Sequence, residues 1–448
     1  MHTSVASTPQ LRRLGFVTAV AGAALICVAT LIPQAGELET SPFCVICGEL
    51  GGVNALLNVL LFVPLGAGLA LSGMRAKNAV LAMILFSAAI EVAQFTVVAG
   101  RDATLGDVIA NSVGGALGFA LPHIGGDLLR PTRRMAFGLT SAWSLGWLAL
   151  QAICNYAFLP DFPPAHYYGQ IARSFENMAT FEGRVLSATI DTVVVPDVGY
   201  AKSEQLREML LQRSVVAATV VPVQPTSAVA PIIRVDTKGR EIVLLAQDGR
   251  DLLFEVRTAA VRLRVRPPIF ILHAAFPDSI PGLQPAFRDT VRLAGRYGVG
   301  RVDMSAEFGS SLLERRLPVS QVLAWTLVSP NRWYISDSLP ERLITWVSVG
   351  LLVFPLGYWG TFARYRTDLS KANDSRDTGR WTILALGAAG ILLLGLVAIP
   401  LLFGLPAVSA GGLVAGLTGL GLGWVGALVA KRHNRHDARA VPRDGLTL

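Results

Sequence analysis

Long apolar runs recur at both ends of this 448-residue chain. A helix needs roughly 20 apolar residues to cross about 30 Å of hydrocarbon. Eight runs meet this requirement, at residues 14–33, 54–73, 79–99, 105–122, 136–159, 342–363, 381–403 and 407–430. The last two are separated by Gly404, Leu405 and Pro406, and we interpret them as a tight hairpin rather than one re-entrant element. With a mean hydropathy of +0.50, the chain is predicted to be an α-helical polytopic membrane protein.

Basic residues predict the orientation of these helices, because Lys and Arg concentrate in short cytoplasmic loops. With the N-terminus inside, the inner segments hold seventeen Lys and Arg residues between Arg12 and Arg443, and the short outer loops hold only Arg101. Both termini are therefore predicted to be cytoplasmic, in a bacterial inner membrane. The net charge of +8 is then a topology signal and requires no nucleic-acid partner. We interpret the first run as a retained anchor rather than a signal peptide, because no clear cleavage site follows it.

Between residues 161 and 340 the composition changes, and apolar residues alternate with polar ones at 184–195, 241–247, 251–258 and 260–266. Turn dipeptides such as Lys238-Gly239 separate these runs, and one helix is expected from Ser203 to Arg213. Many short strands in one segment predict an extracytoplasmic β-sandwich. The predicted domains are residues 1–160 with five helices, the sandwich at 161–340, three helices at 341–430, and a basic cytoplasmic tail at 431–448 that would contact anionic membrane lipids.

Two stretches of the predicted sandwich resemble the concanavalin-like, laminin-G type of fold. They are Ile232–Thr258, with its paired strands and turn, and the hairpin Asp289–Met304. The resemblance implies that the domain could bind a glycan or another protein. A structural envelope domain without a ligand of its own is the alternative, because fold does not imply function.

Polar side chains interrupt the second, third and fourth apolar runs. An ionisable group inside hydrocarbon costs at least a few kcal/mol, so it is kept where it faces a protein interior or a water-filled cavity. Ser87, Glu91 and Gln94 share one helical face by their i, i+4, i+7 spacing. On the next run, Asp107 and Asn111 share a face with Gly114, Gly115 and Gly118, and these glycines would let a neighbouring helix approach closely.

Three blocks in this region resemble the VanZ-like family of bacterial membrane proteins. They are "NVLLFVPLG" from Asn58, "SAAIEVAQF" from Ser87 and "GRDATLGDVIANSVGGALG" from Gly100, and the resemblance covers about residues 10–160. It implies a multi-pass protein of the cell envelope. The founding member is associated with resistance to the glycopeptide antibiotic teicoplanin, and the resemblance implies no particular biochemical activity.

The predicted topology brings seven polar side chains to the outer half of the bilayer, where they could form one ligand-binding pocket: Asn58, Glu91, Gln94, Arg101, Asp102, Asp107 and Asn111. Arg101 could hold two carboxylates, or keep donors free for an anionic ligand. A buried network that only locks three helices together is the alternative. Paired acids often have one raised pKa, so Glu91 and Asp107 are candidates for general acid/base catalysis, which the sequence leaves open.

The four cysteines fall into two groups. Cys44 and Cys47 form a C-x-x-C in the first outer loop, where an oxidising compartment favours a local disulfide. Cys27 and Cys154 lie within apolar runs and are expected to be inert thiols. No metal and no cofactor is expected, because further metal ligands and nucleotide-binding motifs are missing from the sequence.

Three functions of different classes fit these features. The first is an envelope or antibiotic-tolerance factor that binds a lipid-linked or cell-wall-related ligand at the outer pocket. The second is an enzyme acting on such a ligand. The third is a membrane-anchored adhesion or assembly protein whose lectin-like sandwich binds a glycan or a protein.

Overall fold

The computed structural model describes residues 8–33, 41, 43–98, 100, 103–175, 178–200, 202–222, 225–276, 290–298, 300–364 and 386–440, the last eight by their backbone. The chain divides into two compact units, which are described separately. The helical unit comprises Met1–Trp143, Phe354–Leu384 and Leu420–Leu448, and the sheet unit comprises Ser144–Val353 and Ala385–Gly419.

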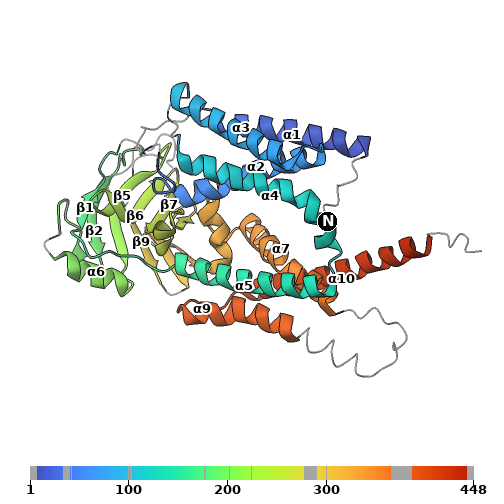
Figure 1. Cartoon of the computed structure of the whole chain (residues 1–448). Helices are drawn as coiled ribbons and strands as arrows, with labels where there is room; N and C mark the ends of the chain where they lie inside the picture. The colour runs from blue at the N-terminus through green and yellow to red at the C-terminus, as the bar shows by residue number, and fades with distance from the viewer. Residues whose placement is uncertain are drawn as a thin grey trace, which may run out of the picture. The chain divides into compact units, whose positions relative to one another are not determined.

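Seven helices in the described part of the chain are long and apolar enough to cross a membrane (Figure 1). They are α1 (Pro9–Thr30), α2 (Gly51–Leu71), α3 (Ala76–Thr96), α4 (Leu105–Leu129), α5 (Arg133–Ala157), α7 (Leu339–Arg364) and α10 (Ala410–Ala440). Large apolar side chains such as Phe16, Leu85 and Phe137 are exposed on them, as lipid-facing positions require. The protein is therefore membrane-embedded.

The predicted span 381–403 begins outside the described residues, and its described part is a shorter apolar helix, Leu386–Leu402. This helix contains a π-helical segment, Leu394–Ala398, and ends in α9 (Ile399–Leu402). The chain then turns at Gly404, which has a φ of +69°. The following helix doubles back, because a Cβ on Gly416 would lie 2.7 Å from a methyl carbon of Leu392.

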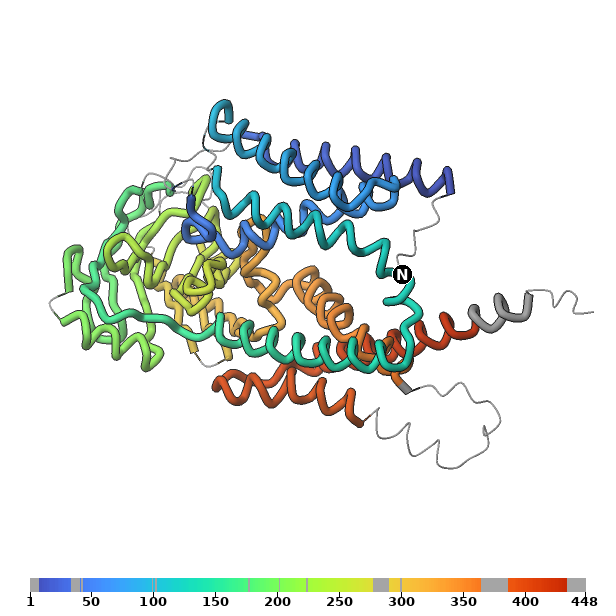
Figure 2. The backbone as a smooth tube through the Cα atoms, in the orientation of Figure 1, coloured from blue at the N-terminus to red at the C-terminus, as the bar shows by residue number. Residues whose placement is uncertain are grey.

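Glycines set the packing of the first four helices. Gly114 and Gly118 of α4 lie against the backbone carbonyls of Val59 and Val63 in α2, and a Cβ at either glycine would collide with those oxygens. Figure 2 shows α2 running beside α4. Two helices can approach this closely only where no side chain intervenes, as is common in membrane bundles. The close approach fixes which residues of α2 and α4 face one another.

Replacing Gly118 by Ala should destabilise the helical unit, because the added methyl group overlaps the Val63 carbonyl. Overpacking of this kind costs about 1 to 3 kcal/mol. Gly125→Ala on the same helix is the matched control, since a Cβ there meets nothing within 4 Å. Thermal unfolding of the purified protein in detergent measures both. Equal unfolding temperatures for the two variants would contradict a tight α2–α4 contact.

The sheet unit contains two six-stranded sheets (Figure 1). The first has the order β1 (Tyr168–Ile171), β5 (Ala230–Thr237), β6 (Arg240–Asp248), β7 (Asp251–Val256), β8 (Ile269–Leu272) and β12 (Tyr334–Ile335). The second has the order β11 (Ser311–Pro318), β10 (Arg301–Phe308), β9 (Val291–Tyr297), β4 (Val216–Val221), β2 (Arg184–Ile190) and β3 (Val193–Val194). Neighbouring strands are antiparallel except for β12, which pairs in parallel with β8.

The two sheets share one buried core, as in a sandwich. Alternate residues of β4, β9 and β10 point into it. The alternation predicted at residues 241–247 is wrong, because β6 is buried at every residue from Ile242 to Gln247. Gly295 of β9 lies against the ring of Phe254 from the opposite sheet, where a Cβ would approach a ring carbon to 2.6 Å. Tyr297 packs edge-on against Phe270, and its hydroxyl donates a hydrogen bond of 2.7 Å to the Phe158 carbonyl.

Several predicted elements are confirmed. The expected helix is α6 (Ser203–Leu211), and the expected hairpin is formed by β9 and β10. The strand predicted at residues 260–266 is wrong, because Ala259–Leu263 forms a 3₁₀-helix, η1. That turn places Arg262 within 2.5 Å of the buried carboxylate of Asp161. Pro267 and Pro268 follow this segment, and neither has an N–H to donate to a neighbouring strand.

Candidate functional site

Thr104 lies at the centre of the polar residues in the helical unit. It is the N-cap of α4, and its Oγ1 accepts a hydrogen bond of 3.2 Å from the Asp107 N–H and donates one of 2.7 Å to Asp107 Oδ2. Its own N–H donates a 3.0 Å hydrogen bond to Glu91 Oε2, which comes from α3. One threonine therefore joins the carboxylates of two helices.

Asn58 brings a third helix into this arrangement. Its Nδ2 donates a 2.5 Å hydrogen bond from α2 to Asp107 Oδ1. Glu91 and Thr104 are buried, with 9% and 7% of their surface exposed, whereas Asn58 and Asp107 are half-buried. We call Asn58, Glu91, Thr104 and Asp107 the Thr104 cluster. Its two half-buried members form its accessible side.

Asn111 and Gln94 make hydrogen bonds to residues outside the cluster. Asn111 Nδ2 donates a 2.9 Å hydrogen bond to Ser87 Oγ, and Asn111 Oδ1 has no partner among the described residues. Gln94 bonds instead to α1, where its Nε2 donates to the Thr30 carbonyl at 2.9 Å. Gln94 is thus held apart from the two carboxylates. Arg101 and Asp102 lie outside the described residues.

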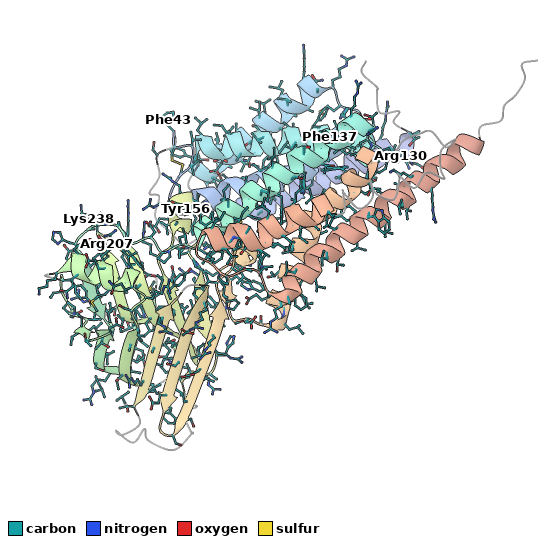
Figure 3. All side chains as sticks on the ribbon, turned by 90° about the horizontal axis from the view of Figure 1, so that it is seen from below. Phe43, Arg130, Phe137, Tyr156, Arg207 and Lys238 are labelled. Carbon is teal, nitrogen blue, oxygen red and sulfur yellow. A yellow bond between two sulfur atoms is a disulfide. The ribbon has the colours of Figure 1, made fainter. Side chains whose placement is uncertain are left out.

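The loop before α2 contacts the first turn of α4. Cys44 and Cys47 form a disulfide, and the Cys44 carbonyl accepts a 3.0 Å hydrogen bond from the Gly106 N–H. A Cβ on Gly106 would collide with the Val45 carbonyl oxygen. Phe43 projects from this loop with 84% of its surface exposed (Figure 3). The disulfide-bridged loop therefore packs against Gly106, which lies between Thr104 and Asp107 of the cluster.

The donors named above that reach the two carboxylates are all neutral: the Asn58 amide, the Thr104 hydroxyl and the Thr104 backbone N–H. The N-terminus of α4 adds a partial positive charge near Asp107. Such a site can accept hydrogen bonds from ligand hydroxyl, amide or ammonium groups, and two neighbouring carboxyls can share a proton. Among the described residues, no group of three or more His, Cys, Asp or Glu side chains is placed to hold a metal ion.

The sequence interpretation missed Thr104, the residue that connects the predicted acids. The signal was present, because Thr-x-x-Asp immediately before an apolar run is the pattern of a capping box. It also missed the Thr30 carbonyl and the Cys44 carbonyl. No sequence signal identifies these two acceptors, because backbone carbonyls become partners only through the packing of distant segments.

Thr104→Val should lower stability, because it leaves the Asp107 N–H and Asp107 Oδ2 without the Thr104 hydroxyl. Loss of an N-cap costs about 0.5 to 2 kcal/mol. Thr104→Ser keeps the hydroxyl and should stay close to the wild type. The comparison uses thermal unfolding in detergent. If the Val and Ser variants unfold at the same temperature, the hydroxyl does not hold the cluster together.

Thiol labelling of denatured, unreduced protein should modify Cys27 and Cys154, which are free in the structure. Labelling after reduction should add Cys44 and Cys47. Mass spectrometry of the labelled peptides identifies each site. Modification of all four cysteines before reduction would rule out the disulfide.

Comparison with known proteins gives one family match. The VanZ/LLP1 family model matches residues 5–125, which include α1, α2, α3 and most of α4. The match contains the Thr104 cluster and ends before α5, so it is shorter than the predicted range of about 10–160. No curated protein and no solved structure matches the chain. Residues 5–125 are therefore VanZ-like, and they belong to a chain that is membrane-embedded.

Proposed function

We propose that this protein acts in the bacterial cell envelope, where the Thr104 cluster binds a lipid-linked or cell-wall-related ligand. The VanZ-like match supports the envelope location and a link to tolerance of teicoplanin-type glycopeptides. The ligand class follows from the chemistry of the cluster, whose carboxylate and amide groups suit the hydroxyl, amide and ammonium groups of sugars and peptides.

The convergence of two carboxylates on Thr104 carries the proposal. Glu91 and Asp107 come from different helices, yet both bond to this one residue. Locking helices together does not require two acids, because a single neutral hydrogen bond such as that from Asn111 to Ser87 joins α4 to α3. Two carboxylates near one another favour hydrogen-bond donors beside them. A bound ligand would supply such donors.

The half-buried side of the cluster supports access for a ligand. Asp107 and Asn58 retain exposed surface, while Glu91 and Thr104 are buried. We place this side, the sandwich-like domain and the Cys44–Cys47 loop outside the inner membrane, with both termini in the cytoplasm. The distribution of Lys and Arg supports this orientation. The Cys44–Cys47 disulfide supports it too, because disulfides persist in oxidising compartments outside the cytoplasm.

Glu91→Gln and Asp107→Asn test the proposal, because each keeps the size of the side chain and one acceptor oxygen while removing its charge. Expressed in a teicoplanin-susceptible bacterium, the wild type should raise the inhibitory concentration, and both variants should lose that effect. Lipid mass spectrometry of the purified proteins should find the bound ligand in the wild type and not in the variants. Asp127→Asn, an exposed carboxylate on the same helix, is the matched control and should behave as the wild type.

Thermal unfolding of the same variants separates a site from a scaffold. If the two acids only lock the helices, their neutral variants should lose stability together with function, by about 1.5 to 3 kcal/mol for a hydrogen bond to a charged group. If they bind a ligand, unliganded Glu91→Gln should unfold near the wild type, because its amide oxygen can still accept from the Thr104 N–H; Asp107→Asn loses one acceptor in either case. Normal tolerance and normal stability in both variants would sink the proposal. If the wild type converts the bound ligand to a product and the variants do not, the protein is an enzyme in which these carboxylates act.

A further inference from the structure

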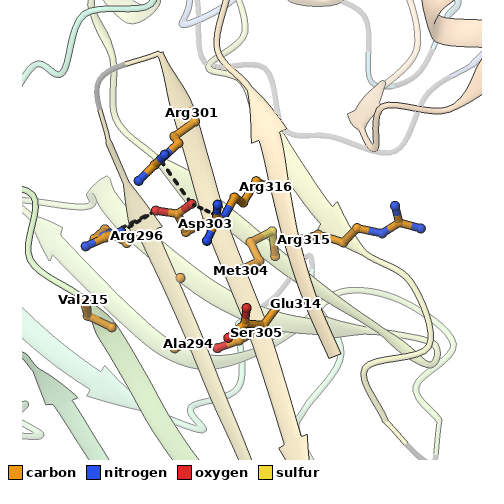
Figure 4. A pocket seen from close by; sticks show the side chains of 11 residues that line it. Val215, Ala294, Arg296, Arg301, Asp303, Met304, Ser305, Glu314, Arg315 and Arg316 are labelled. Atoms are coloured by element: carbon orange, nitrogen blue, oxygen red, sulfur yellow. Dashed lines mark hydrogen bonds and ion pairs between the residues drawn. The ribbon is translucent and has the colours of Figure 1, made fainter. Parts of the chain in front are cut away.

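The second sheet of the sheet unit carries a concave site of about 240 Å³ on its solvent face. Arg296 of β9, Arg301 and Asp303 of β10, and Arg316 of β11 line it (Figure 4). The strand register puts Asp303 directly opposite Arg296 on one side and Arg316 on the other. Because β10 alternates, Val302 points into the core while Arg301 and Asp303 point outward. We call this site the arginine pocket.

One carboxylate lies within ion-pair distance of three guanidinium groups in this pocket, and its hydrogen bonds go to Arg296. Asp303 Oδ2 lies 2.6 Å from an Arg296 nitrogen, and Asp303 Oδ1 lies 3.3 Å from Arg301 Nε and 3.9 Å from Arg316 Nε. The side chain of Asp303 is 22% exposed, whereas those of Arg296, Arg301 and Arg316 are 43%, 52% and 73% exposed. Each guanidinium has five N–H donors, so most of the donors around Asp303 still face solvent.

The charges of the pocket do not balance. On this face Arg296, Arg301 and Arg316 contribute three positive charges, and Asp303 and Glu314 contribute two negative ones, which leaves +1; Arg315 lies on the other face of β11, opposite the buried Met304. Charged residues on the edge strand β11 would also discourage edge-to-edge aggregation, but either sign serves that purpose. Three arginines gathered on one carboxylate repel one another. An anion bound between their free edges would relieve this repulsion.

From this geometry we infer that the arginine pocket binds the phosphate group of a phosphorylated ligand. A phosphate monoester carries about −1.5 to −2 charges at neutral pH and offers three oxygens to the three guanidinium groups of this face. Guanidinium groups pair with phosphate oxygens through two parallel hydrogen bonds, and Asp303 holds two of the arginines in position for this. The site lies in the sheet unit and does not depend on the role of the Thr104 cluster.

The test uses the full-length protein in a maltoside detergent, which contributes no phosphate. Isothermal titration calorimetry with glucose 1-phosphate probes a soluble source, and native mass spectrometry with dioctanoyl phosphatidic acid probes a lipid headgroup. Glucuronate and dioctanoylglycerol are the corresponding probes without phosphate. Binding of either phosphate probe, and not of its control, is expected, and the probe that binds identifies the source.

The double variant Arg301→Gln, Arg316→Gln should weaken this binding by about tenfold or more, because two charge-assisted contacts are lost. The double variant Arg184→Gln, Arg240→Gln removes the same charge at exposed positions outside the pocket and should bind as the wild type. Both variants should unfold at the wild-type temperature, since all four side chains are exposed. The inference is overturned if neither phosphate probe binds, if glucuronate binds as well as glucose 1-phosphate, or if the pocket variant retains full affinity.

Discussion

Hydrocarbon offers no hydrogen-bond partner, so every polar group among the transmembrane helices must find its partner within the protein. The Thr104 cluster meets this requirement through one residue that belongs to the end of a loop and the start of a helix. Thr104 uses its hydroxyl to satisfy the first turn of α4 and its N–H to satisfy a carboxylate of α3. The positions of Glu91, Asp107 and Asn58 all follow from where α4 begins.

Backbone contact between helices makes this arrangement possible. Gly114 and Gly118 allow α4 to lie directly on α2, and Gly115 lies against the Met83 sulfur of α3. Side chains as short as those of Asn58 and Asp107 can then reach one another across the α2–α4 contact. The sheet unit also contains such contacts, for example where Gly295 makes room for the Phe254 ring between its sheets.

Sequence patterns predicted those features that depend on local periodicity. The apolar runs identified the helices, the i, i+4, i+7 spacing placed Glu91 on a buried face, and the glycines of α4 indicated a close helix contact. Patterns failed where a distant residue decides the local structure. Residues 260–266 alternate like a strand, yet the ion pair of Arg262 with Asp161 holds them in a turn. The arginine pocket was not predicted either, because its members meet only through the register of three strands.

The contact between the bridged loop and α4 restricts how this part of the chain can vary. Gly106 must remain without a side chain because the Val45 carbonyl occupies the place of a Cβ, and its N–H must remain opposite the Cys44 carbonyl. Residues 43–47 and 104–107 are therefore constrained together, because a change in either segment disturbs the contact that both form. An insertion within residues 43–47 or within residues 104–107 would move the Cys44 and Val45 carbonyls away from Gly106. Related chains should keep both lengths even where their sequences differ.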